Sequence, residues 1–264
     1  MEMHEHAPSG GFAVEAIGIL FFAGMVLLYL LAVHFSNYRY KPWPLYRIFF
    51  WFAGVFSAGA ALIGPISGAA HSDFKAHMLA HLLLGMLAPI LLALSAPMTL
   101  VFRTVSVRSG RRLSRLLKSR PLRFFSHPLT ASILNIGGLF VLYTTGLFQL
   151  MHENHIVYIL VHIHIFLAGY LFTIAIIYID PAPHRFSFIY RSAILILALA
   201  GHGILAKYIY ANPPASVPRN AAEAGGMLMY YGGDAVDVLL IIILCWQWYK
   251  SERPRLSAAE DVAN

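Results

Sequence analysis

Two histidines four residues apart are the side chains best placed to do chemistry in this sequence. His77 and His81 stand in the run AHMLAHLLLGMLAP at residues 76–89, near the start of an apolar helix. This spacing puts both imidazoles on one helix face, about one turn or 6 Å apart. Ionisable side chains are costly in hydrocarbon, so their presence in an apolar helix indicates a function. The pair predicts half of a metal site whose remaining ligands come from other helices.

The composition is that of an integral membrane protein. Of the 264 residues, 59% are hydrophobic and only 12% are charged, and the mean hydropathy is +0.67. These values lie far outside the range of soluble domains. The single cysteine, Cys245, excludes an internal disulfide framework and any Cys-X-X-Cys motif. Metal chemistry in this chain therefore has to use histidine, methionine or carboxylate ligands.

Seven apolar stretches of roughly 20 residues are long enough to cross a hydrocarbon core of ~30 Å. They cover residues 11–34, 46–66, 77–101, 129–150, 156–179, 189–210 and 226–248. The connections are short and no internal repeat is present, so the sequence predicts one all-α domain over residues 1–264, a polytopic bundle of seven transmembrane helices. Pro89 and Pro97 predict a kink in the third helix. The first residues lack the basic region and cleavage site of a signal peptide, so we expect them to be retained.

The basic residues predict the orientation of this bundle. Sixteen of the 19 lysines and arginines fall in residues 35–47, 102–128, 180–191 and the tail from Lys250. Cytoplasmic loops collect Lys and Arg, so the N-terminus is predicted outside and the C-terminus inside. The basic cytoplasmic loop 102–128 has leucines among its arginines, which is typical of an amphipathic helix on the inner surface of the lipid bilayer. Topology thus accounts for the formal charge of +7, and no nucleic-acid partner is predicted.

The histidines gather on the opposite side. With that topology, three of the 13 lie inside, namely His34, His127 and His184. The other ten lie in outer loops or in the outer halves of helices: His4, His6, His71, His77, His81, His152, His155, His162, His164 and His202. The predicted topology rests on Lys and Arg alone, so the uneven distribution of the histidines is a separate observation.

Five helices are predicted to supply polar groups to one outer layer. A rise of 1.5 Å per residue places His81 about 6 Å, His162 about 9 Å and His202 about 12 Å below the outer ends of their helices. Asp234 lies at about 12 Å in the seventh helix and Glu15 at about 6 Å in the first. No histidine or acidic residue lies comparably deep in the inner half.

Spacing within the helices refines this layer. His162 and His164 are about 200° apart around their helix, so they are not expected to bind one ion as neighbours. Asp234 and Asp237 share a face, where they could orient imidazoles by accepting their N–H groups. A lone intramembrane histidine such as His202 is also typical of a hydrogen-bonded contact between helices.

Thioethers are a further possible ligand class. Met78, Met86, Met227 and Met229 carry soft sulfur atoms suited to cuprous ion, although methionine in apolar helices usually only packs. Imidazole with optional thioether or carboxylate suits copper, zinc, iron or haem. An outer site without thiolates favours copper handled outside the cytoplasm.

Several sequence runs resemble one family. They are HMLAHLLL at 77–84 leading to Ala88-Pro89, SAP at 95–97, HIHIFLAG at 162–169, DPAPHR at 180–185 and MYYGGD at 229–234. In this order the chain resembles, from about residue 40 to 250, the multi-spanning CtaG-type cytochrome c oxidase assembly factors of bacteria. It does not resemble the single-anchor family that shares the CtaG label and carries a copper-binding cysteine pair.

The resemblance implies a non-enzymatic role in the biogenesis of a haem-copper terminal oxidase in the bacterial plasma membrane, where copper reaches the oxidase. Cytochrome c oxidase subunits are the implied partners. The motifs carry over a metal site made from His77, His81, His162, His164, His202 and Asp234. We expect a copper chaperone whose exposed histidines collect the ion: His4, His6, His71, His152 and His155.

Two other functions remain open from the sequence. A b-type haem-binding or quinone-linked membrane oxidoreductase also has layered histidines in its helices, but the second layer near the inner face is missing here. A copper transporter needs deep polar residues in the inner half to complete a pathway, and the sequence has no ATP-binding motif.

Overall fold

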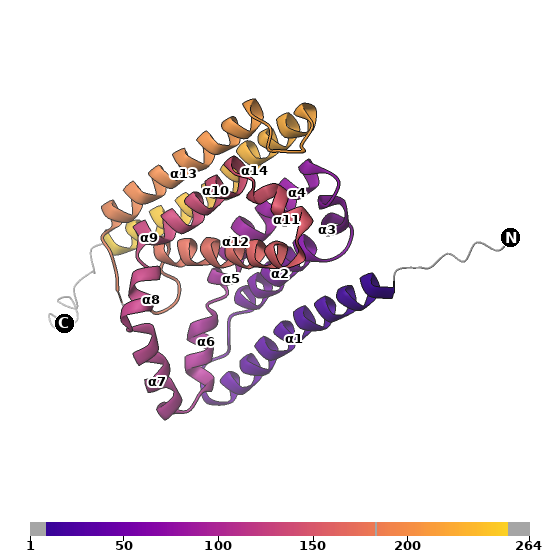
Figure 1. Ribbon diagram of the computed structural model, residues 1–264. Helices are drawn as coiled ribbons and strands as arrows, with labels where there is room; N and C mark the ends of the chain where they lie inside the picture. The colour runs from indigo at the N-terminus through magenta and orange to yellow at the C-terminus, as the bar shows by residue number, and fades with distance from the viewer. Residues whose placement is uncertain (1–8, 183, 253–264) are drawn as a thin grey trace, which may run out of the picture.

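The computed structural model describes residues 9–182 and 184–252, and every regular element in these ranges is a helix (Figure 1). The first half contains α1 (Ser9–Arg39), α2 (Leu45–Leu62), α3 (Pro65–Ala70), α4 (Phe74–Leu82), the π-helix η1 (Leu83–Leu87), α5 (Ala88–Leu94), α6 (Pro97–Thr104), α7 (Val107–Leu117) and α8 (Arg120–Phe125). The second half contains α9 (Pro128–Ser132), the π-helix η2 (Ile133–Gly137), α10 (Gly138–Thr144), α11 (Leu147–Glu153), α12 (His155–Ile176), α13 (Phe188–Ala211) and α14 (Arg219–Glu252). The predicted all-α class is confirmed.

Six helices of the described chain are long and apolar enough to cross a membrane. They are Glu15–Arg39, Leu45–Leu62, Phe74–Leu94, His155–Ile176, Phe188–Ala211 and Arg219–Glu252. A seventh span exists if the bent pair Pro128–Thr144 and Leu147–Glu153 is counted as one. The prediction of a polytopic helical membrane protein is therefore confirmed, with six to seven spans.

The fourth predicted span, 129–150, is not one continuous helix. It stops at Thr144, and α11 turns away from α10 by 77°. The hydroxyls of Thr144 and Thr145 donate to the carbonyls of Phe140 and Val141, each at 2.6 Å. Because these bonds satisfy carbonyls that a helix end leaves free, the chain can turn here at low cost.

The third predicted span, 77–101, is also interrupted. Its apolar helix ends at Leu94, and Ala96 adopts a left-handed conformation with φ of 52° before Pro97 opens α6. The carboxylate of Asp180 accepts hydrogen bonds from the backbone N–H groups of Met98 (2.9 Å) and Thr99 (2.7 Å). This cap ties Asp180, the first residue of the DPAPHR run, to the start of α6, so both sequence motifs contribute to the structure.

Helix α1 is fixed to the bundle near its C-terminal half. The hydroxyl of Tyr29 donates to the carbonyl of Ser95 at 2.8 Å, and Trp43 Nε1 donates to the same hydroxyl at 3.1 Å. Glu15, near the other end of α1, is exposed. The expectation that Glu15 joins a shared polar layer is therefore wrong, because α1 runs along the outside of the bundle (Figure 1).

Two π-helical segments lie inside the bundle, one in the third span and one in the fourth. A π segment is a local irregularity in a helix and is often found at functional sites. In η1, Ser57 Oγ donates to the carbonyl of Leu83 at 3.1 Å, and in η2, His164 Nε2 bonds the carbonyl of Leu134 at 3.2 Å. Side chains of neighbouring helices therefore support both irregularities.

Helix α12 packs directly on η1. A Cβ built on Gly169 would overlap the carbonyl oxygen of Gly85, so the two backbones touch and no larger residue fits at that position. This close approach brings α12 against the segment that follows His81, and it fixes one wall of the central cavity described below.

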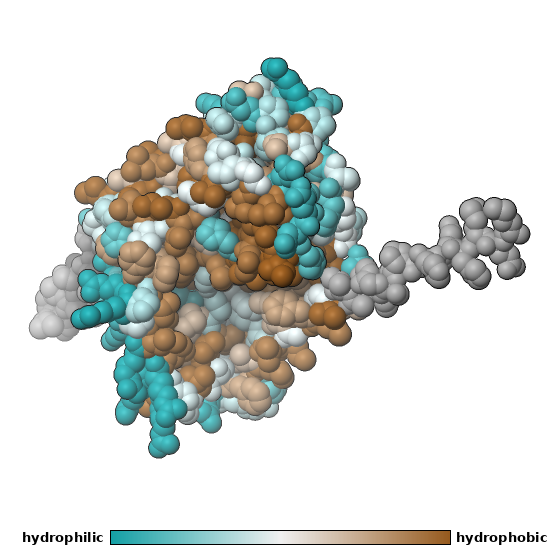
Figure 2. Space-filling model, viewed as in Figure 1, coloured by the Kyte–Doolittle hydropathy of each residue, from teal (hydrophilic) through white to brown (hydrophobic). Residues whose placement is uncertain are grey.

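The two ends of the molecule differ in character. We call the end formed by α3, α11 and the 212–218 connection the histidine end, and the end formed by α6, α7 and α8 the basic end (Figure 1). Figure 2 shows apolar residues over the middle of the visible face and hydrophilic residues over α7. The loop 102–128 contains α7 and α8, which have no buried residues. Its contact with the inner lipid surface stays a prediction.

Candidate functional site

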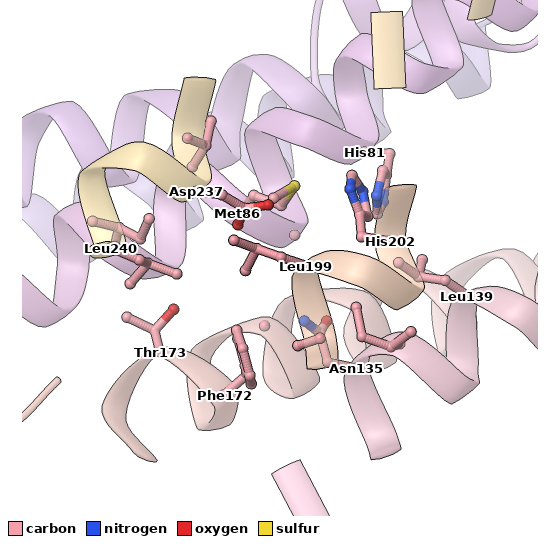
Figure 3. A pocket seen from close by; sticks show the side chains of 16 residues that line it. His81, Met86, Asn135, Leu139, Phe172, Thr173, Leu199, His202, Asp237 and Leu240 are labelled. Carbon is pink, nitrogen blue, oxygen red and sulfur yellow. The ribbon is translucent and has the colours of Figure 1, made fainter. Parts of the chain in front are cut away.

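A small internal cavity lies at the centre of the bundle. Its volume is about 20 Å³, and its walls come from α4, η1, α5, η2, α10, α12, α13 and α14 (Figure 3). Six of its 16 lining side chains carry nitrogen, oxygen or sulfur: His81, Met86, Asn135, Thr173, His202 and Asp237. A space of this size holds about one water or one ion. Both π segments contribute to it, Gly85 and Met86 from η1 and Asn135 and Ile136 from η2.

His81 and His202 are the central pair of this cavity, and we call them the deep pair. Their ring centres are 6.4 Å apart, and the side chains lie next to each other in Figure 3. Two imidazoles that face one ion through nitrogens at about 2 Å have ring centres roughly 6 Å apart. The spacing of the deep pair therefore fits an ion held between the two rings.

The nitrogens of the deep pair are buried and lack partners. His81 is 4% exposed and His202 is 3% exposed. Both ring nitrogens of His81 and Nε2 of His202 form no hydrogen bond with the described residues. Buried polar groups are almost always paired, and an exception calls for an explanation such as a bound ion. The deep pair has the free lone pairs that a metal ligand needs.

Close packing holds the rings of the deep pair in place. A Cβ on Gly233 would overlap Cε1 of His202, so the Cε1 edge of this ring lies against the backbone of α14. A Cβ on Gly85 would lie 3.4 Å from Cε1 of His81, which is an ordinary contact distance. Gly233 therefore leaves the space that the imidazole of His202 occupies.

A carboxylate and a thioether complete the polar wall. Asp237 is 5% exposed, and within the described chain it forms neither a hydrogen bond nor an ion pair. Met86 lies on the same cavity (Figure 3). A buried carboxylate without partners is costly, so Asp237 is a further candidate ligand on the wall that the two imidazoles line.

A second group of histidines lies between the cavity and the histidine end, and we call them the mouth histidines: His71, His77, His152 and His162. Three of them donate Nδ1–H to a backbone carbonyl one helical turn earlier, because a carbonyl can only accept. The partners are Ser67 for His71 (2.9 Å), Phe148 for His152 (2.9 Å) and Tyr158 for His162 (2.8 Å).

These bonds leave Nε2 of each of the three rings with a free lone pair. Ligating histidines usually donate their other ring N–H in this way, which fixes both tautomer and ring orientation. The three rings therefore have fixed orientations, each with one ring nitrogen left unbonded among the described residues.

Tyr143 stands between the mouth and the deep pair. Its hydroxyl and His77 Nε2 are 3.0 Å apart, and its ring centre is 6.0 Å from that of His77 and 6.4 Å from that of His81. Tyr143 is only 2% exposed. The polar groups therefore run from the exposed His152 through His77 and Tyr143 to the cavity.

The structure separates some of the residues that the sequence grouped. His164 is exposed and bonds a carbonyl of η2, whereas His162 is buried among the mouth histidines, as their angular separation predicts. Asp234 is exposed, and Asp237 takes the place at the cavity. His4 and His6 lie outside the described residues.

The six predicted ligands do not surround one point. Within residues 9–182 and 184–252, no three His, Cys, Asp or Glu side chains are close enough to hold an ion together. The four buried histidines among them are instead spread along the interior of the bundle: His77, His81, His162 and His202. Of the methionines considered, Met78 and Met229 are fully buried in the core and Met227 is 48% exposed, so only Met86 reaches the cavity.

Sequence reasoning missed Asn135 and Thr173, and it considered Asp237 only as an orienting partner. One signal was available for Asn135, which is a strongly polar residue inside an apolar segment. The π segments that turn Met86 and Asn135 toward the cavity have no sequence pattern that single-chain reasoning can use.

The fold and the site define a polytopic helical membrane protein with a buried, histidine-lined cavity. The family model of the cytochrome c oxidase caa3 assembly factor matches residues 27–251, and the chain belongs to that family. This confirms the resemblance seen in the sequence.

The chain is also similar to longer mycobacterial proteins. It is 30% identical over 266 residues to the uncharacterized protein Mb0105 of Mycobacterium bovis, covering 90% of this chain and 40% of that protein. It is 28% identical over 242 residues to the uncharacterized protein ML1998 of Mycobacterium leprae, covering 84% and 37%. The chain thus spans about 40% of the length of the curated relatives it matches. No solved structure matches it at a significant level.

Proposed function

We propose that this protein is a non-enzymatic copper-delivery factor for a haem-copper cytochrome c oxidase in the bacterial plasma membrane. Membership of the oxidase assembly family supports the destination. The deep pair supports the cargo, because two buried imidazoles with free nitrogens and a nearby thioether suit cuprous ion. The unpartnered nitrogens of His81 and His202 are the observation on which this proposal chiefly rests.

The proposed orientation places the histidine end outside the cytoplasm. The exposed His71 and His152 would then meet ions on that side, and the arginines of α7 would face the cytoplasm. Copper would enter past the mouth histidines, bind at the deep pair and leave toward an oxidase subunit in the same membrane. Two-nitrogen coordination suits transfer, since few bonds have to break when the ion is released.

The size of the cavity argues against a haem. Sites for large ligands occupy about 300–1,000 Å³, whereas this cavity has about 20 Å³. Transport across the membrane is also disfavoured. Part of the cavity wall belongs to an apolar cluster that includes Ile90, Phe172, Ile176, Leu240 and Leu244, and these side chains offer a cation no ligands.

The test is anaerobic titration of the purified full chain with cuprous ion against a coloured cuprous chelator. We expect the double variant His81→Ala/His202→Ala to lose the high-affinity copper, while His34→Ala, an exposed histidine of α1, keeps it. In cells, the oxidase of the double variant should contain less copper per haem than the oxidase of the His34→Ala strain. Equal copper in wild type and double variant would overturn the proposal.

A further inference from the structure

The bend between α10 and α11 brings a further histidine, His152, to the mouth of the site. A straight helix through residue 150 would carry the following residues past the end of the bundle, away from α4. The 77° turn brings α11 back, and the ring centre of His152 lies 6.1 Å from that of His77. This spacing is close to the 6.4 Å of the deep pair.

His77 and His152, which we call the mouth pair, have different surroundings: one ring is buried and the other is exposed. His152 is exposed, and its bond to the carbonyl of Phe148 leaves Nε2 free to bind. His77 is 4% exposed and is enclosed by Phe74 and Phe148, with ring centres at 6.0 and 5.2 Å. One ligand therefore meets ions in water while the other lies in an apolar wall, so an ion bound between them is partly stripped of water.

We propose that His77 and His152 form a second copper-binding station at the mouth, and that Tyr143 orients His77 and separates this station from the deep pair. The proposal rests on the copper function proposed above. A copper ion binds first between His77 and His152, and then passes the side chain of Tyr143 to reach His81.

The hydrogen bond between Tyr143 and His77 gives the tyrosine its role. With Nε2 of His77 bonded to the hydroxyl at 3.0 Å, the ring is held in one orientation and Nδ1 is the nitrogen left for the ion. When Nδ1 binds the ion, Nε2 carries the proton and donates to the hydroxyl oxygen. Loss of such an orienting partner typically lowers metal affinity about 10- to 100-fold.

Copper stoichiometry tests the two stations separately. The purified full chain is saturated with cuprous ion under anaerobic conditions, and the copper retained after desalting is counted by elemental analysis. We expect two ions in wild type and one in His152→Ala. The matched control is His155→Ala, an exposed histidine three residues later with no ring contact to His77 among the described residues, which should retain two.

The variants also separate this inference from the function on which it rests. If His152→Ala retains as much copper as wild type while His81→Ala/His202→Ala loses an ion, the mouth station is wrong and the copper function stands. If the deep-pair variant loses none, the copper function itself fails.

Tyr143→Phe tests the orienting bond and preserves the packed ring. We expect the weaker of the two copper affinities to fall about 10-fold or more and the tighter one to stay unchanged. Loading of the deep pair from a cuprous chelate should slow by a similar factor in His152→Ala. Unchanged affinities in Tyr143→Phe together with unchanged loading in His152→Ala would overturn the proposal.

Discussion

Asp180 and Asp237 are two sheltered carboxylates with opposite surroundings. At the basic end, Asp180 accepts hydrogen bonds from the backbone of Met98 and Thr99 and from the Thr99 hydroxyl at 2.6 Å. At the central cavity, Asp237 is more deeply buried and receives none from the described chain. One carboxylate is used to build the fold, and the other is left available to a ligand.

The groups around the two carboxylates differ in the same way. At the basic end, the Thr99 hydroxyl and the backbone N–H groups of Met98 and Thr99 are all paired with Asp180. Beside Asp237, the nitrogens of His81 and Nε2 of His202 lack partners within the described residues. Single unpaired atoms also occur elsewhere in the described chain, at Trp51 Nε1 and Arg191 Nε, whereas the cavity brings together three such nitrogens on two adjacent rings.

The sharpest test of this difference removes one imidazole of the deep pair. His202→Ala should lower cuprous affinity about 100-fold or more, since a direct ligand contributes more than an orienting group. The free energy of unfolding without copper should also fall, by about 2–3 kcal/mol, because the removed ring leaves a cavity in the packed bundle. Chelator competition and thermal unfolding measure the two quantities, and a large loss of stability with unchanged affinity would contradict the functional reading.

Asp180→Ala should change stability alone. Losing the hydrogen bonds to Met98 and Thr99 should cost about 2–3 kcal/mol of unfolding free energy and leave copper affinity unchanged. Asp73→Ala is the matched control, since Asp73 caps α4 through one bond to Lys75 N and should cost about 1 kcal/mol. Equal losses in the two variants would show that the Asp180 cap is not special.

Gly233→Ala should disturb the deep pair without removing a ligand. The added methyl group meets the ring of His202, so the ring has to shift and copper affinity should fall about 10- to 100-fold. Gly24→Ala is the control, because a Cβ there meets no atom within 4 Å. Titration of both variants measures the effect, and equal affinities would mean that the position of His202 is not critical.

Asp237→Asn should give the smallest effect. Copper affinity should fall about tenfold or less, because the carboxylate lines the cavity without being one of its two imidazoles. Without copper, the variant should unfold at the same or a slightly higher temperature, since a buried carboxyl group without partners is replaced by a neutral amide. A fall in that temperature as large as the one in Asp180→Ala would erase the contrast between the two carboxylates.

Much of the architecture was accessible from residue patterns. The apolar stretches predicted the spans because backbone groups in lipid must be bonded within a helix. The angular separation of His162 and His164 predicted that they would face different surroundings, and they do. Depth along the helices also predicted that His81 and His202 share a layer, and their rings lie side by side.

Other features were beyond such patterns. Asp234 and Asp237 are three residues apart and share a broad helix face, yet only Asp237 is buried. The side of α14 that packs against α4 and α13 is narrow, so a difference of about 60° around the helix separates the cavity from the surface. The bend after Thr144, which brings His152 to His77, has the same origin in packing and local hydroxyl bonds.

The sequence by itself determined that this chain enters a membrane as a helical bundle and that histidines concentrate toward one end of it. Both follow from the cost of placing polar atoms in hydrocarbon, which each residue meets separately. Only the tertiary structure decided which imidazoles stand together and which nitrogens stay unpaired. Those properties depend on the π segments, on the contact of Gly85 with Gly169 and on the bend before α11. Each of these features involves the packing of several helices together, which no single stretch of sequence determines.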